Sequence, residues 1–273
     1  MFRFSLWTIS ILFSFLYACG NSKKNSSEEA LIGMLVLNSL GASCVTETLY
    51  VGGPSCQTCI DASLPTWIKD NFHCVTVTKS GSNYVFTTKN LPPYKSYYYG
   101  STSPYFEVMG GGNTGNPNLI QSQNYTLTIP VNPVFDATPD ASSLGAVGIS
   151  TYGVVLFNNE AAPGDDLTAE YSSFDQSEGH PTASGEYHHH TEPPKLTNNG
   201  SELIGVILDG YPIYGKKTET GSYPSLDADT GTRSCTNAYF PSGTYCYHVR
   251  NGSGVNGYLV SKYRGVKGTA SGK

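Results

Sequence analysis

Two histidines at alternate positions of one short segment are the residues of this chain best suited to chemistry. They are His188 and His190, within the run Tyr-His-His-His at 187–190. Successive side chains of a β-strand point to opposite faces, so on a strand these two imidazoles share one face and can bind one metal ion. His189 points to the other face, and we expect it to be an ordinary strand residue.

A second copy of this pattern lies nearer the C-terminus, as Tyr-Cys-Tyr-His at 245–248. In this copy, the strand face that corresponds to the one with His188 and His190 carries Cys246 and His248. The order of strand, turn, strand, acidic loop and strand recurs in 148–190 and 204–248, with a period of about sixty residues. This period is too long, and two units are too few, for a solenoid. The sequence therefore predicts a tandem duplication.

Packing of the two units with approximate symmetry would bring their histidines to one site. Three imidazoles, from His188, His190 and His248, suit Zn²⁺ or copper, whereas Ca²⁺ and Mg²⁺ prefer oxygen ligands. Oxidation of Cys246 would withhold its thiolate and leave the histidines, with His180 as candidate fourth ligand. Three protein ligands beside an open position are typical of catalytic zinc, and four protein ligands of a structural site.

A second interpretation of the same residues stays open. Tyrosines and histidines on a buried strand can form a polar core in which each imidazole is hydrogen-bonded to an acid or a carbonyl. The acidic residues at matching places in the two units are either partners that orient the histidines or turn residues that cap their own backbone. They are Asp175, Asp227 and Asp229, together with Asp209, for which the following Gly-Tyr-Pro favours the turn role.

The residues of both units resemble the YHYH domain family, bacterial envelope proteins named after a Tyr-His-Tyr-His motif. The resemblance is carried by both motif copies, by Gly179-His180 and by Asp-Gly-Tyr-Pro-Ile-Tyr-Gly at 209–215, and it extends upstream to Trp67. It implies an exported domain with a suspected metal-binding role and no settled activity, so the question of an enzyme stays open. This chain has His189 in place of the second tyrosine and Cys246 in place of the first histidine.

The cysteines predict a compartment that allows disulfides. Of the seven, Cys19 belongs to the N-terminal region, and the other six are Cys44, Cys56, Cys59, Cys74, Cys235 and Cys246. An even number suits three bridges in an oxidising envelope compartment. Proximity favours Cys235 with Cys246 and pairing of the four upstream cysteines among themselves.

The N-terminus has the features of an export signal. Arg3 precedes an uncharged apolar run at 4–16, which is too short to span a bilayer. The following Leu-Tyr-Ala-Cys resembles the lipobox of bacterial lipoproteins, with Tyr17 where a small residue is usual. We expect Cys19 to carry lipid and to anchor the chain to a membrane of the cell envelope, on its periplasmic or surface-exposed face.

Composition predicts an all-β or strongly β-rich fold. The chain has 30 Gly, 16 Pro and 20 Tyr but only 14% charged residues, which favours short strands and many turns. Alternation in 75–78 and 84–88 predicts a β-hairpin, and 125–130 predicts a further strand. The formal net charge of −5, without a cluster of basic residues, gives nucleic-acid binding no support.

We therefore expect duplicated β units packed on an upstream β region, with one short N-terminal helix. The expected segments are a signal peptide (1–18), a lipidated tether with the short helix (19–43), a cysteine-stapled β-rich region (44–144), the duplicated domain (145–265) and a flexible tail (266–273). An alternative function is that of a surface protein with structural histidines, which contacts a protein partner through its tyrosine-rich segment, 94–105. The oligomeric state stays open.

Overall fold

The computed structural model describes residues 42–142, 144–162, 164–197 and 199–272. Within them the chain is built almost wholly of strands, sixteen in three sheets, which confirms the β-rich fold class. The described helical elements are α2 (Thr66–Lys69) and four 3₁₀ turns, at Tyr97–Tyr99, Leu167–Ala169, Tyr171–Ser173 and Gly254–Asn256. No helix in this part of the chain is long and apolar enough to cross a membrane. The signal segment, Cys19 and the expected N-terminal helix lie outside the described residues.

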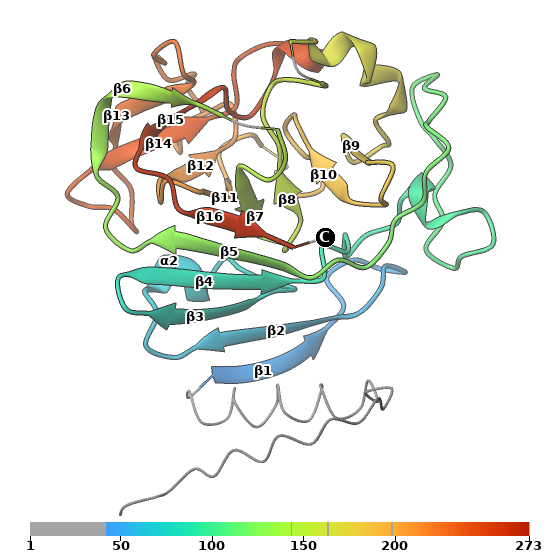
Figure 1. Cartoon of the computed structure of the whole chain (residues 1–273), viewed down its shortest axis with the longest axis horizontal. Coiled ribbons are helices and arrows are strands. Elements are labelled where there is room, and N and C mark those ends of the chain that lie inside the picture. The colour runs from blue at the N-terminus through green and yellow to red at the C-terminus, as the bar shows by residue number, and fades with distance from the viewer. Residues whose placement is uncertain (1–41, 143, 163, 198, 273) are drawn as a thin grey trace, which may run out of the picture. The chain divides into compact units, whose positions relative to one another are not determined.

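A six-stranded sheet occupies the lower part of the molecule in Figure 1. Its spatial order is β1 (Ala42–Glu47), β2 (Cys56–Asp61), β3 (Thr76–Ser80), β4 (Asn83–Thr88), β5 (Tyr125–Pro130) and β16 (Thr269–Ser271). The predicted hairpin is β3 with β4, and the predicted strand at 125–130 is β5. Residues 266–273, expected as a flexible tail, instead supply β16, because its pairing satisfies the backbone groups on the open edge of β5.

All six cysteines of the described chain pair, in the bridges Cys44–Cys59, Cys56–Cys74 and Cys235–Cys246. The first joins β1 to β2 at positions directly opposite each other in the antiparallel ladder. The second ties the start of β2 to the residue that precedes β3 by two positions. These two bridges therefore staple the edge of the six-stranded sheet, as the cysteine spacing predicts.

The second half of the chain forms an eight-stranded sheet. Its spatial order is β13 (Gly231–Cys235), β14 (Thr244–His248), β12 (Pro212–Tyr214), β11 (Leu203–Ile207), β7 (Gly148–Ser150), β8 (Val155–Leu156), β10 (Tyr187–His189) and β9 (Gly179–Pro181).

The two units repeat the same pairing around the centre of this sheet. In each, an antiparallel pair (β7 with β8, β11 with β12) is followed by a parallel neighbour (β10, β14) and then by an antiparallel edge strand (β9, β13). The units meet where β7 pairs antiparallel with β11 and Ile149 lies opposite Val206. The duplication is thus an approximate two-fold repeat within one sheet.

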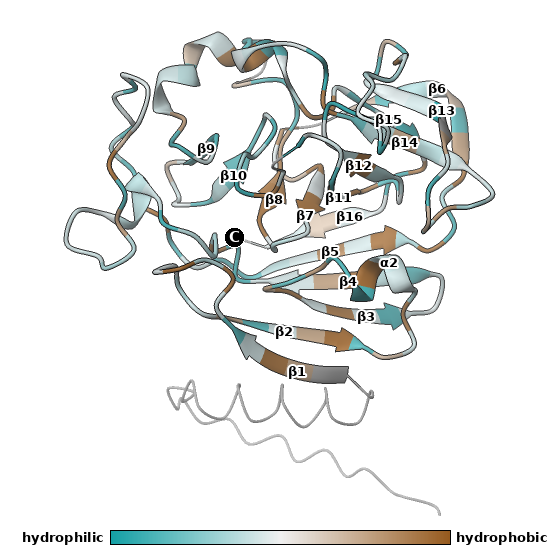
Figure 2. Ribbon diagram, turned by 180° about the vertical axis from the view of Figure 1, so that it is seen from behind, coloured by the Kyte–Doolittle hydropathy of each residue, from teal (hydrophilic) through white to brown (hydrophobic). Residues whose placement is uncertain are grey.

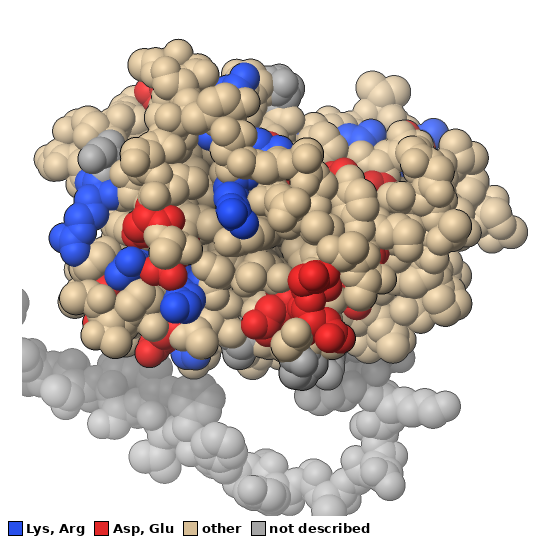
Figure 3. Space-filling model, turned by 90° about the horizontal axis from the view of Figure 1, so that it is seen from above, with Lys and Arg blue, Asp and Glu red and all other residues tan. Residues whose placement is uncertain are grey.

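One hydrophobic core joins the two large sheets. It combines buried side chains such as Phe86 and Leu127 from the first sheet with Ile149, Val206 and Ile213 from the second. Hydrophobic residues concentrate in the central strands β7, β8 and β12 (Figure 2). A small third sheet pairs β6 (Phe135–Ala141) with β15 (Lys262–Gly265). On the face in Figure 3, basic and acidic side chains form small separate groups on a mostly uncharged surface.

We predict that loss of the bridge between β1 and β2 destabilises the protein. A disulfide that closes a loop of this size, with a separation of 15 residues, contributes about 3 kcal/mol by restricting the unfolded chain. Cys44→Ser/Cys59→Ser should lower the free energy of unfolding by about that amount. Urea denaturation followed by the fluorescence of the buried Trp67 measures it. Val45→Ala, at a half-exposed position of β1, is the matched control, and equal midpoints for both variants would contradict the prediction.

Candidate metal site

Three histidines gather on one face at the edge of the eight-stranded sheet. His180 lies on β9 and His188 on β10, directly opposite each other in the antiparallel ladder. His190 follows His188 by two positions and therefore lies on the same face, as the alternation predicts. The Nδ1 or Nε2 atoms that these three residues can offer to a metal all lie within 4.8 Å of one another. All three side chains are buried.

Aromatic rings hold the three imidazoles in place. Phe157 stacks on His188 with ring centroids 3.9 Å apart. Phe174 lies parallel to His190 at 5.8 Å and edge-on to His180 at 4.8 Å. Packing on two sides leaves these rings little freedom to turn.

The Nδ1 atom of each imidazole has an oxygen partner. His188 Nδ1 lies 3.0 Å from the carbonyl oxygen of Glu186, and His190 Nδ1 lies 2.6 Å from that of Asn158. A carbonyl only accepts, so both Nδ1 atoms must carry the hydrogen. His180 Nδ1 lies 2.6 Å from the hydroxyl of Ser173, which donates its own hydrogen to a backbone carbonyl and so accepts from the imidazole. In the neutral state each Nε2 is thus a bare lone pair.

These lone pairs face one another. His188 Nε2 and His190 Nε2 are 2.9 Å apart, and His180 Nε2 is buried without a hydrogen bond. Burial lowers the pKa of His180 to about 3 and that of His190 to about 4, and it lowers the pKa of His188 well below its usual range. The imidazoles therefore stay neutral near pH 7, and protonation does not relieve the repulsion between their facing lone pairs. A cation that accepts the lone pairs would relieve it. Metal-binding imidazoles have the same arrangement, with each Nδ1 atom oriented by a hydrogen bond.

Glu170 adds a carboxylate to the same place. Its Oε2 lies 3.4 Å from His180 Nε2 and 3.9 Å from His190 Nε2, and burial raises its pKa. A cavity of about 620 Å³ opens in front of the histidines, with Glu170, Ser173 and Phe157 in its wall. Sequence reasoning missed Glu170 and Ser173, because both lie in an irregular loop where no spacing relates them to the histidines.

His189 points away from the site. Its Nδ1 donates to the carbonyl oxygen of Glu178 at 2.9 Å, and its Nε2 lies 2.8 Å from the hydroxyl of Tyr94. Both nitrogens therefore have partners, as in a satisfied core histidine. His189 thus differs from the three histidines on the opposite face, whose Nε2 lone pairs are unused.

The predicted acidic partners act on backbone and tyrosines instead of histidines. Asp175 Oδ1 accepts the amides of Ser177 and Gly179, and its carboxylate accepts the hydroxyl of Tyr187. Burial raises the pKa of Asp175 to about 6, although these hydrogen bonds oppose the shift. The second unit repeats the arrangement with Asp227, which accepts the Tyr245 hydroxyl at 3.0 Å.

The remaining acidic residues pair elsewhere. Asp229 lies 2.8 Å from the guanidinium of Arg264. Asp209 caps its turn by accepting the amide of Tyr211 at 3.4 Å, and it also accepts the hydroxyl of Tyr247. The turn role expected for Asp209 agrees with these contacts.

His248 does not join the other three histidines. It belongs to a second group, with Cys235 and Cys246, on β13 and β14. The pairing order places four strands between β14 and β10, and strands are spaced about 4.8 Å apart, so the two groups are separated by about 24 Å along the sheet. The two-fold repeat puts equivalent residues at opposite ends of the sheet, whereas the sequence interpretation brought them to one point.

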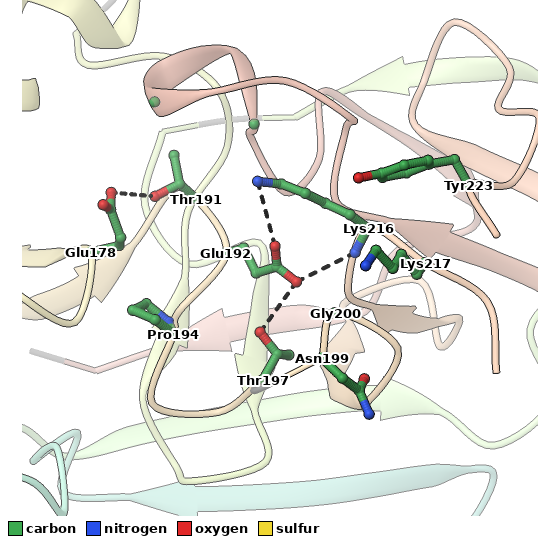
Figure 4. Close-up of a pocket in the computed structure, with 12 residues that line it drawn as sticks. Glu178, Thr191, Glu192, Pro194, Thr197, Asn199, Gly200, Lys216, Lys217 and Tyr223 are labelled. Atoms are coloured by element: carbon green, nitrogen blue, oxygen red, sulfur yellow. Dashed lines mark hydrogen bonds and ion pairs between the residues drawn. The ribbon is translucent and has the colours of Figure 1, made fainter. Parts of the chain in front are cut away.

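Another cavity, of about 360 Å³, lies between loops of the two units and is drawn in Figure 4. Glu192 occupies its centre. This carboxylate accepts the hydroxyl of Thr197 and the amide of Lys216, and it forms an ion pair with the Lys216 ammonium at 3.5 Å. The charge of Glu192 is satisfied within the protein, so this carboxylate differs from the histidines with their unused lone pairs.

Comparison with known proteins agrees with the motif. The model of the family described as YHYH protein matches residues 126–239. This segment contains the three clustered histidines and ends before the second motif copy, so it is shorter than the resemblance that the sequence suggests. No curated protein and no solved structure gives a significant match. Residues 126–239 thus match the YHYH family, and the candidate metal site lies within this segment.

Proposed function

We propose that this protein is a lipid-anchored protein of the cell envelope that binds Zn²⁺ or a copper ion through His180, His188 and His190. The observation that carries the proposal is the convergence of three buried Nε2 lone pairs whose Nδ1 atoms are all hydrogen-bonded to oxygens. Imidazole nitrogen is a preferred ligand of both metals.

The dimensions of the group support a metal of this size. In a tetrahedral zinc site with Zn–N bonds of about 2.0–2.1 Å, neighbouring ligand nitrogens are about 3.3 Å apart. The two closest Nε2 atoms of the site are separated by 2.9 Å, so a small outward movement of one ring would admit the ion. Glu170 is placed to supply a fourth ligand or to accept a proton from a molecule bound in the cavity.

The alternative of purely structural histidines receives less support. A structural imidazole has partners for both nitrogens, as His189 does. The tyrosine-rich segment offers only part of its rings to a partner, because Tyr94 and Tyr98 are 1% and 0% exposed, whereas Tyr97, Tyr99 and Tyr105 are partly buried. The three disulfides suit an oxidising envelope compartment, which supports the proposed location.

We expect His188→Ala/His190→Ala to abolish metal binding. The tag-free full chain should retain about one equivalent of Zn²⁺ or Cu²⁺ after desalting, and the double variant should retain none, because a single imidazole and a carboxylate do not hold the ion. Elemental analysis by mass spectrometry gives the stoichiometry.

His189→Gln is the matched control for this experiment. It removes an imidazole from the same strand but from the opposite face, so metal content should not change. Retention of metal by the double variant, or its absence from the unmodified chain, would rule out this site.

Ser173→Ala tests the oriented hydrogen bond behind the site. Without the Ser173 hydroxyl, His180 loses the partner that fixes its tautomer, and loss of such an outer partner lowers metal affinity by about 10–100-fold. Competition with a chromogenic chelator measures the affinity. Ser177→Ala is the control. It removes another hydroxyl of the same loop, one that is buried and has no hydrogen-bond partner. It should leave the affinity unchanged, and equal affinities for both variants would contradict the role of Ser173.

Stability of the metal-free protein should fall on acidification below pH 7. The histidines titrate near 6.5 in the unfolded chain, but burial keeps the pKa of His180 at about 3 and that of His190 at about 4 in the folded chain. Between these values the unfolded chain binds more protons, so the free energy of unfolding decreases by about 2 kcal/mol per histidine from pH 7 to pH 5.

The variant His180→Asn isolates this contribution. It removes one of the groups, so its free energy of unfolding should change with pH by about 2 kcal/mol less than that of the unmodified chain. Urea titrations at pH 7, 6 and 5 in the presence of a chelator provide the comparison. Parallel pH dependences would show that His180 is not kept neutral by the fold.

A further inference from the structure

The second motif copy places sulfur where the first places imidazole. Thr232 lies opposite Cys246 across β13 and β14, as His180 lies opposite His188 across β9 and β10. Cys246 therefore occupies the position of His188, and His248 occupies that of His190. The two-fold repeat thus presents a second group of potential ligands in the same local geometry.

The ring of His248 is oriented like that of His190. Its Nδ1 donates to the carbonyl oxygen of Gly215 at 2.8 Å, as His190 Nδ1 donates to that of Asn158. The Nε2 lone pair is thereby turned toward the sulfurs and lies 3.7 Å from Cys235 Sγ. The two Sγ atoms and a ring nitrogen of His248 lie within 4.8 Å of one another.

In the disulfide form the two sulfurs are not available as thiolates. They are bonded to each other in the Cys235–Cys246 bridge, and a metal of the zinc or copper type requires the deprotonated thiol. The donor set S, S, N is therefore present but masked by oxidation.

A cavity borders one of the two cysteines. It has a volume of about 350 Å³, and Cys235 and His248 form part of its wall. Cys246 is fully buried, whereas Cys235 is 8% exposed. Cys235 is thus the residue of the bridge that a reductant in the cavity meets first.

We propose that Cys235, Cys246 and His248 form a second metal site that is opened by reduction of the disulfide by a dithiol. One thiolate of the dithiol attacks Cys235 Sγ, the bond between the two protein sulfurs breaks, and Cys246 leaves as a thiolate. The second thiol of the reductant then attacks the mixed disulfide. This step releases Cys235 as a thiolate and leaves the reductant as a cyclic disulfide. Two electrons pass from the dithiol to the protein disulfide.

The reduced site favours a soft or borderline ion. Two thiolates and one imidazole suit Zn²⁺ or Cu⁺, and binding of Zn²⁺ to the reduced site releases the protons of the two thiols. The first site has no sulfur and does not depend on reduction. The protein would then hold one metal under all redox conditions and a second only under reducing ones.

The test uses Co²⁺ as a probe in the full chain carrying His188→Ala/His190→Ala. The first site is absent from this variant, so the result does not depend on whether the first site binds metal. Reduction with a water-soluble phosphine, which cleaves the disulfide without adding thiols, should create binding of about one equivalent of Co²⁺. Thiolate ligands should produce a charge-transfer absorption in the near ultraviolet. The oxidised protein should show neither.

Two further variants in the same background assign the signal. The N-terminal bridges are also open to reduction, so Cys235→Ser/Cys246→Ser, which keeps those four cysteines, must lose the band. His248→Ala keeps all the thiols and should weaken Co²⁺ binding at least 10-fold. Circular dichroism checks that each reduced variant remains folded. Absence of the band when thiol titration shows full reduction and the protein is folded, or its persistence in the double serine variant, would overturn the proposal.

Discussion

The close pairing of β7 with β11 is the contact on which the eight-stranded sheet depends, because it joins the two units. It requires glycine at both equivalent positions. A side chain at Gly205 would place its Cβ 2.1 Å from the carbonyl oxygen of Ile149, and one at Gly148 would place it 2.6 Å from that of Val206. The backbones can therefore approach only without side chains at these two positions. Once they pair, every later strand of one unit has a counterpart in the other.

The repeat preserves the parts that build each edge of the sheet. In both units an aspartate caps a loop, accepts the amide of the glycine that opens the edge strand and holds the tyrosine of the motif. That glycine again leaves no room for a side chain, since a Cβ at Gly179 or Gly231 would overlap the ring of Tyr187 or Tyr245. The framework around the ligands is thus common to both units, and the positions of His180 and His188 are the ligand positions that differ.

The sequence predicted the local part of this arrangement well. Alternation placed His188 and His190 on one face, and the proximity of Cys235 to Cys246 predicted their bridge. The position of His248 was not predictable in the same way, because a repeat in the sequence does not state whether equivalent residues meet at the symmetry axis or lie far from it. Here the axis passes between β7 and β11, and the motifs lie near the two ends of the sheet.

Glu170 and Ser173 were also beyond prediction, for a different physical reason. They lie in 3₁₀ turns and irregular backbone between β8 and β9, where neither a period of 2 nor one of 3.6 relates side-chain direction to sequence. Their contribution depends on where the loop folds back, and Phe174 of the same loop packs against the imidazoles.

The two units differ most in how they satisfy the lone pair that the shared framework turns inward. His190 and His248 have the same place and the same Nδ1 hydrogen bond. In the first unit the facing groups are imidazoles whose own lone pairs add to the repulsion, an arrangement that suits a bound cation. In the second unit the facing groups are sulfurs joined to each other, which carry no charge. With Thr232 and Cys246 in the places of His180 and His188, and with Cys235 beside them, the second unit holds a disulfide where the first holds three converging imidazoles.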